Sequence, residues 1–251
     1  MSGFKGKVAI VTGGAQGMGR EYVRLLAEAG ASVVIADVNE SVAAATIEEI
    51  GAGDRVVFQH TDVGSVEACN ACAKVAVDRF GGIDYLVNNA GLLSAAAHRS
   101  LVQVDLDIYH NVLGVMSHGM LYMVRAVVPA MVARGGGAIV NTSSIGAYQT
   151  AGLYSLAKLF VNGLTVNLAQ ELAEQNIRVN AIAPGTVATE GMQPLMSVEQ
   201  MAAWGKMGGR PTDRVAHPAE IARAGLFLLS DAASYVRGQI IAVDDGQQVR
   251  V

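Results

Sequence analysis

The chain has 251 residues, of which 51% are hydrophobic and 16% are charged, and its formal net charge is −4. This composition excludes a disordered chain, and the absence of a basic stripe argues against nucleic acid or an acidic membrane surface as a partner. No composition shift or proline-rich linker divides the chain, so we expect one domain over residues 1–251.

The sequence also indicates the cellular compartment in which the protein is expected. No run reaches about 18 uninterrupted apolar residues, so no membrane span is expected, and the start of the chain does not resemble a signal peptide. Cys69 and Cys72, the only cysteines, have no second ligand pair and lie on one side of a predicted helix. We therefore expect no metal site and a reducing, cytoplasmic compartment.

Strand-like and helix-like segments alternate along the chain. The expected strands cover residues 8–12, 32–37, 55–60, 85–87, 138–142, 178–182 and 240–243. The expected helices cover residues 20–29, 40–50, 66–80, 104–133, 153–174 and 218–229. Because the strands are continuously apolar, they are typical of a parallel sheet buried on both faces. The predicted fold is α/β, a single-domain Rossmann-type doubly wound sheet of about seven parallel strands with helices on both faces.

A glycine-rich turn follows the first predicted strand and precedes a helix. Its residues are Gly13, Gln16, Gly17, Met18 and Gly19. Glycine permits positive φ and close approach of a pyrophosphate, and the helix N-terminus offers free N–H groups. This context predicts a dinucleotide site, with an ordinary tight turn as the alternative.

Asp37 ends the second predicted strand, where a carboxylate can accept hydrogen bonds from both hydroxyls of an adenosine ribose. Its charge would repel the 2′-phosphate of NADP, and Val38 and Asn39 follow instead of an arginine. The expected cofactor is therefore NAD, with NADP less favoured. A solvated aspartate at a strand end is the alternative.

Two more strand ends carry residues suited to the adenosine side of such a cleft. Asp62 and Val63 follow the third strand, where a carboxylate could reach the adenine amino group. Asn89, Ala90 and Gly91 follow the fourth strand and tolerate tight backbone. Either of these two motifs alone more often marks an ordinary turn. Only the two together strengthen the prediction of a dinucleotide site.

Tyr154 and Lys158 lie four residues apart at the start of a predicted helix, which places them on one face. A tyrosine with its usual pKa of about 10 is a poor base at neutral pH, and we expect the ammonium and a nicotinamide charge to lower it. Ser144 can bind a substrate oxygen, with Ser143 as a rival for that role. Asn111, in the long helix, could hold a water that links Lys158 to solvent.

These motifs occur in the order of the short-chain dehydrogenase/reductase family, which the chain resembles over nearly its whole length. The matching residues are Thr12, Gly13, Gly17, Gly19, 88–91, Asn111, Ser144, Tyr154, Lys158, Pro184 and Gly185. The resemblance implies a tetrad of Asn111, Ser144, Tyr154 and Lys158, with Lys158 also bonding the nicotinamide ribose. It further implies a homotetramer, and a nicotinamide-side loop that contains Pro184, Gly185, Val187 and Thr189.

The resemblance implies a reversible reaction, in which Tyr154 takes the alcohol proton while hydride passes to NAD⁺. Two departures from the family stand out. The segment between Ser144 and Tyr154 is shorter than in many relatives, and Asp245 stands where relatives usually carry glycine.

Residues 190–215 are expected to form a loop that covers the substrate. Methionine suits an adaptable apolar pocket, so we expect Met192, Met196 and Trp204 to contact substrate, although packing within a lid is an equal alternative. Leu93 and Tyr148, with the neighbouring Gln149, are expected on the opposite side.

The predicted protein is an oxidoreductase that transfers hydride between NAD(H) and an apolar or aromatic secondary alcohol or ketone. The alternatives within enzymes are a β-ketoacyl-thioester reductase and a cis-diol or hydroxysteroid dehydrogenase. A catalytically silent nucleotide-binding scaffold on the same fold is the alternative outside enzymes.

Overall fold

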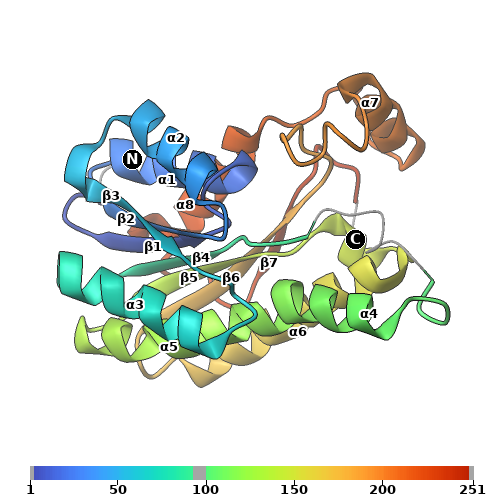
Figure 1. The fold of residues 1–251 in the computed structure, drawn as a ribbon. Coiled ribbons are helices and arrows are strands. Elements are labelled where there is room, and N and C mark those ends of the chain that lie inside the picture. The colour runs from blue at the N-terminus through green and yellow to red at the C-terminus, as the bar shows by residue number, and fades with distance from the viewer. Residues whose placement is uncertain (1–2, 93–99, 249–251) are drawn as a thin grey trace.

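One parallel sheet runs through the part of the chain described by the computed structural model, residues 3–92 and 100–248 (Figure 1). Its strands are β1 (Val8–Thr12), β2 (Ser32–Asp37), β3 (Val56–His60), β4 (Tyr85–Asn88), β5 (Gly137–Thr142), β6 (Ile177–Pro184) and β7 (Ile240–Val243). The strand order is β3-β2-β1-β4-β5-β6-β7, which confirms the predicted fold class. From β1 the chain adds β2 and β3 on one side of the sheet, and β4 to β7 are then added on the other side of β1. A crevice at the carboxyl ends of the strands is expected between β1 and β4, where the order of strands switches.

Helices cover both faces of the sheet. The α-helices are α1 (Gly17–Glu28), α2 (Glu40–Ile50), α3 (Val66–Phe80), α4 (Leu106–Leu113), α5 (Gly119–Ala133), α6 (Gly152–Glu171), α7 (Val198–Met207) and α8 (Pro218–Leu229). Short 3₁₀ turns occur at η1 (Gly53–Arg55), η4 (Ile145–Tyr148) and η5 (Asp231–Ala233). Figure 1 shows α1, α2 and α8 on one face and α3, α5 and α6 on the other, with α7 set apart at one end.

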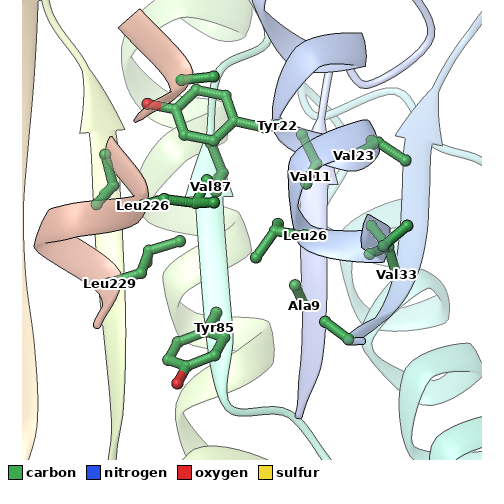
Figure 2. Packing of buried hydrophobic residues seen from close by; sticks show 14 of the residues in the cluster. Ala9, Val11, Tyr22, Val23, Leu26, Val33, Tyr85, Val87, Leu226 and Leu229 are labelled. Atoms are coloured by element: carbon green, nitrogen blue, oxygen red, sulfur yellow. The ribbon is translucent and has the colours of Figure 1, made fainter. Parts of the chain in front are cut away.

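The hydrophobic core forms two layers because alternate residues of each strand face opposite sides. Val11 packs with Tyr22, Leu26 and Leu226 in the layer beneath α1 and α8 (Figure 2). Its neighbour Ile10 belongs to the other layer, with α3 and α5. This two-sided burial explains why the strands are continuously apolar in sequence.

The element bounds differ from the predicted ones at helix ends. Helix α1 begins three residues earlier than expected, inside the glycine turn, and α6 ends at Glu171 instead of 174. The turn after α6 passes through Asn176, whose φ is 56°. The predicted helix 104–133 begins at Leu106, after Asp105 accepts a hydrogen bond from the Asp107 N–H, and a π-turn, η3 (Gly114–His118), interrupts it.

The whole helical run Leu106–Ala133 is long and apolar enough to cross a membrane by length and composition alone. A core helix of a soluble protein meets the same test, and 44% of its most apolar stretch is buried within the fold. Its α5 part packs against α3, β4 and β5, and contact with these elements accounts for the apolar side chains.

Candidate active site

A cavity of about 490 Å³ opens at the carboxyl ends of the strands. Every residue predicted to bind the cofactor lines this cavity except Gly19: Gly13, Gln16, Gly17, Met18, Asp37, Val38, Asp62, Val63, Asn89, Ala90, Gly91, Tyr154, Lys158, Pro184, Gly185, Val187 and Thr189. These residues lie at or just after the carboxyl ends of β1, β2, β3, β4 and β6, or on α6, which follows β5, so the sheet itself brings them together.

Gly19 does not line the cavity but allows α1 to pack closely against the glycine turn. A Cβ atom there would lie 1.9 Å from the Gly13 carbonyl oxygen, so only glycine lets α1 pack this closely on the turn. On the cleft side, the Thr12 hydroxyl oxygen accepts hydrogen bonds from the Asn89 and Ala90 N–H groups at 2.9 and 3.0 Å. The ends of β1 and β4 are thereby held together at the crevice.

The end of β2 presents a carboxylate to the cleft. Asp37 accepts hydrogen bonds from the Ala15 N–H at 3.1 Å and the Asn39 N–H at 3.0 Å, and Val38 beside it is exposed. Among the described residues that line the cleft, Lys158 is the only Lys, Arg or His. A cofactor with an additional phosphate on the adenosine ribose would therefore meet the Asp37 carboxylate without a compensating cation.

Lys158 and Tyr154 project from the first two turns of α6. Lys158 Nζ donates a hydrogen bond to the Thr142 carbonyl oxygen at 2.8 Å and lies 6.0 Å from the centre of the Tyr154 ring. The Tyr154 phenol forms a hydrogen bond with the Ser144 side chain. A Cβ atom on Gly146 would approach the Tyr154 ring to 2.8 Å, so the glycine makes room for that ring.

Burial controls both pKa values. It raises the pKa of the Tyr154 phenol, and the hydrogen bond with Ser144 only partly opposes this shift. Burial also lowers the pKa of Lys158 to about 8. The expected lowering of the Tyr154 pKa by Lys158 is therefore not found in the protein alone, because desolvation of the phenolate has the larger effect.

The two candidate serines differ in their partners. The Ser143 hydroxyl forms a 2.6 Å hydrogen bond with Oδ1 of Asn162, within the core, whereas Ser144 is the residue that meets Tyr154. Both residues line the cavity. The geometry therefore favours Ser144 over Ser143 for contact with a substrate oxygen.

Asn111 is not part of this constellation. It is exposed on α4 and is absent from the residues that line the cleft. Met116, in the π-turn, is buried and lines the cleft instead. The structure brings together three of the four residues of the expected tetrad, and it places the asparagine outside.

The opposite end of the cleft is mostly apolar. Met192, Trp204 and Gln149 line it as expected, whereas Tyr148 and Met196 do not, and Leu93 lies outside the described residues. Further lining residues that the sequence did not reveal are Leu92, Val115, Met116, Ile145, Ala151 and Gln247. Within the expected loop 190–215, residues Val198–Met207 form helix α7. The signal for it was the capping box of Ser197 and Gln200.

The free polar groups of the cleft fit a dinucleotide. The Thr189 hydroxyl, the Thr142 hydroxyl and Oδ1 of Asn89 are buried side-chain atoms with no hydrogen-bond partner, and all three residues line the cavity. Buried polar atoms of this kind call for a ligand or water. Asp37, the α1 N-terminus and Thr189 would hold the adenosine ribose, the diphosphate and the nicotinamide end.

The remaining sequence predictions concern residues outside the cleft. Cys69 and Cys72 are free thiols within the α3 side of the core, and the described residues contain no cluster of three or more His, Cys, Asp or Glu side chains fit for a metal. Asp245 has a φ of 57°, so the aspartate adopts the left-handed turn that glycine would favour, and it bonds the Thr212 hydroxyl. The unusual residue is therefore tied by a hydrogen bond to Thr212, which lies 33 residues earlier in the chain.

Comparisons with known proteins agree with this geometry. The chain matches over residues 13–248 the family model described as enoyl-(acyl carrier protein) reductase. It is 45% identical to an uncharacterized oxidoreductase of Mycobacterium tuberculosis, covering 98% of this chain and 99% of that protein. It is 36% identical to cyclohexanol dehydrogenase of an Acinetobacter species, covering 96% and 94% of the two chains.

Among solved structures, a short-chain dehydrogenase/reductase from Mycobacterium marinum superposes with a TM-score of 0.90 at 30% identity, covering 98% of this chain and 97% of the other. The family binds NAD(P) and acts on small molecules. From its sequence, its fold and these matches, the chain belongs to the short-chain dehydrogenase/reductase family of oxidoreductases.

Proposed function

We propose that the protein is an NAD(H)-dependent oxidoreductase that interconverts an apolar alicyclic or aromatic secondary alcohol and its ketone. The observation that carries the proposal is the contact of Ser144 with Tyr154, one helical turn from Lys158, in the cleft that all three residues line. NAD is favoured over NADP by Asp37 and by the absence of an Arg among the described residues that line the cleft.

The protein's own groups provide binding and proton transfer. Ser144 orients the substrate oxygen, and the Tyr154 phenol donates a proton to it in reduction or accepts one in oxidation. Because burial raises the pKa of Tyr154, the neutral phenol is the form that the ligand-free site favours, and it is ready to donate. NAD(H), when bound, supplies the hydride acceptor or donor. Lys158 is held by the Thr142 carbonyl near the phenol, where its ammonium favours the phenolate left after donation.

The apolar end of the cleft supports the choice of substrate. Met116, Ile145, Met192 and Trp204 surround it, and Lys158 is the only Lys, Arg or His among its described lining residues. A ring of carbon atoms suits these walls, whereas a charged thioester carrier has no basic partner there. Cyclohexanol dehydrogenase, a relative over 96% of this chain, is consistent with this choice.

A β-ketoacyl-thioester reductase is the second candidate, because the matching family model is described as an acyl-carrier-protein reductase. Cis-diols and hydroxysteroids remain alternatives within the apolar class.

We also propose a cytoplasmic homotetramer. Helix α6 exposes the apolar side chains of Leu156, Leu159, Phe160 and Val166, which a second copy of the chain would cover. Light scattering of the purified protein tests the tetramer, and a mass below that of four chains would refute it.

The test of the function is NADH absorbance with purified protein, NAD⁺ or NADP⁺, and a panel of cyclic alcohols, aryl alcohols, diols, hydroxysteroids and β-hydroxyacyl thioesters. Tyr154→Phe should lower kcat by about 10²- to 10⁴-fold. Tyr235→Phe, at a fully exposed site, is the matched control and should leave kcat unchanged. Equal turnover by the Tyr154→Phe variant would refute the role of Tyr154. Turnover only with NADP⁺ would refute the proposal that Asp37 favours NAD over NADP.

A further inference from the structure

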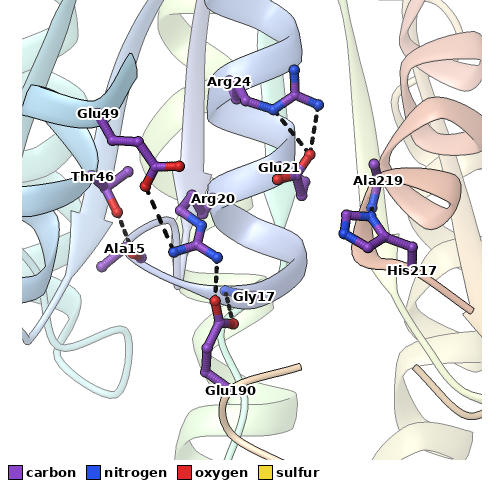
Figure 3. A network of polar contacts seen from close by, with 10 residues as sticks. All are labelled: Ala15, Gly17, Arg20, Glu21, Arg24, Thr46, Glu49, Glu190, His217 and Ala219. Atoms are coloured by element: carbon purple, nitrogen blue, oxygen red, sulfur yellow. Dashed lines mark hydrogen bonds and ion pairs between the residues drawn. The ribbon is translucent and has the colours of Figure 1, made fainter. Parts of the chain in front are cut away.

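The segment that covers the substrate is fastened to the glycine turn by one carboxylate (Figure 3). Glu190 Oε2 accepts a hydrogen bond from the Gly17 N–H at 3.1 Å, and Oε1 pairs with the Arg20 guanidinium. Arg20 also lies 3.9 Å from Glu49 on α2. The first residue of the cover is therefore attached both to the N-terminal N–H of α1 and to a side chain in its first turn.

This attachment uses the atoms that suit a diphosphate. Gly17 opens α1, where unpaired N–H groups and the helix dipole attract an anion. In the ligand-free protein that anion is the carboxylate of Glu190. One N–H group makes one good hydrogen bond, and two anions at the same helix end repel each other. The diphosphate and Glu190 therefore compete for this position.

Glu190 lies in the same chain segment as residues on the substrate side of the cleft. Thr189, Gly191 and Met192 flank Glu190 in sequence and line the cavity, as does Trp204 on α7. A Cβ atom on Gly17 would lie 3.4 Å from Cβ of Thr189 and 3.8 Å from Oε2 of Glu190, so the turn lies close to the start of the cover. Displacing Glu190 therefore changes the position of the residues that meet the substrate.

We propose that Glu190 is a latch: it holds the cover to the α1 N-terminus in the empty enzyme, and the cofactor's diphosphate replaces it there. Cofactor binding thus frees Glu190 from Gly17 and changes the position of the cover residues that line the cavity, Gly191, Met192 and Trp204. This inference rests on the proposed function, since it requires a dinucleotide in the cleft.

The test uses the full-length protein and NADH. Trp204 is the only tryptophan and lines the cleft, so its fluorescence reports both NADH binding and the position of the cover. Glu190→Gln removes the charge and Glu190→Ala removes the whole contact. Glu49→Gln is the matched control, because it alters the environment of Arg20 without touching Gly17.

We expect both Glu190 variants to bind NADH about threefold to tenfold more tightly than wild type, and Glu49→Gln to bind within about twofold of it. In the unliganded Glu190 variants, the Gly17 amide should exchange hydrogen faster, and the Trp204 emission should shift toward that of the NADH complex. Unchanged affinity and emission in both Glu190 variants, in a protein that binds NADH, would overturn the latch alone. Failure of the wild type to bind NADH or NADPH would overturn the proposed function and the latch with it.

Discussion

Replacing Lys158 by methionine should remove a stability cost that depends on pH. Lys158 is 4% exposed, and its ammonium bonds the Thr142 carbonyl but forms no ion pair with any described carboxylate. Burial lowers the pKa of this lysine from 10.5 to about 8. The folded protein therefore holds a charge that water would solvate better, and Lys158→Met keeps most of the length of the side chain without that charge.

The size of the effect follows from the two pKa values. A fall from 10.5 to about 8 corresponds to about 3 kcal/mol of destabilisation at neutral pH. Below pH 8 the lysine is protonated in both the folded and the unfolded chain, so the cost is present in full. Between about pH 8 and 10.5 the unfolded chain binds more protons than the folded one, so stability rises with pH. Above 10.5 both forms are neutral and the cost is gone.

The assay is urea unfolding of wild type and Lys158→Met at one fixed protein concentration, at several values between about pH 7 and 10.5. Other groups titrate in both proteins and cancel in the difference. The wild type should gain about 3 kcal/mol relative to the variant across this range, while the lost bond to Thr142 adds a constant that does not vary with pH. A difference that stays flat would refute the argument that Lys158 is desolvated.

Two further predictions concern residues outside the constellation. Asn111→Ala should change kcat by less than about twofold, because its side chain is exposed outside the cleft; a loss of about tenfold or more in steady-state assays would contradict this placement. Burial raises the pKa of Cys69 to about 12 and that of Cys72 to about 11, so both thiols should resist a disulfide reagent at pH 8 until urea unfolds the protein. Rapid labelling of the native protein would contradict their burial.

The cofactor side of the cleft could be predicted from sequence because it depends on strand ends. Parallel strands bring their carboxyl ends to one edge whatever their separation along the chain, so Asp37, Asn89 and Pro184 had to converge. No knowledge of side-chain direction was needed. Three of the seven strands have the predicted bounds, and the other four differ from them by one or two residues at an end, which does not move a strand end out of the crevice.

The substrate side could not be predicted in the same way, since it depends on how one irregular segment folds back. Met192 and Met196 are four residues apart in the same segment, yet only Met192 lines the cavity. Met201 is fully buried, whereas Met207 is exposed. The composition predicts an apolar cover, but the packing of the folded segment, including α7, determines which methionine lines the cavity.

The misplacement of Asn111 has a different cause, because a helical pattern visible in the sequence contradicted the family motif. Val104, Ile108, Val112 and Met116 recur every four residues and pack against Leu153 and Ala157. Neighbouring residues on a helix are about 100° apart around its axis, so Asn111 turns away from the face that carries Val112. The Asn111 side chain could reach Lys158 only if the apolar face that carries Val112 no longer packed against α6. The side chain that faces the cleft is therefore Met116, whose thioether is at most a weak hydrogen-bond acceptor, and the water-holding role expected of Asn111 has no amide to perform it there.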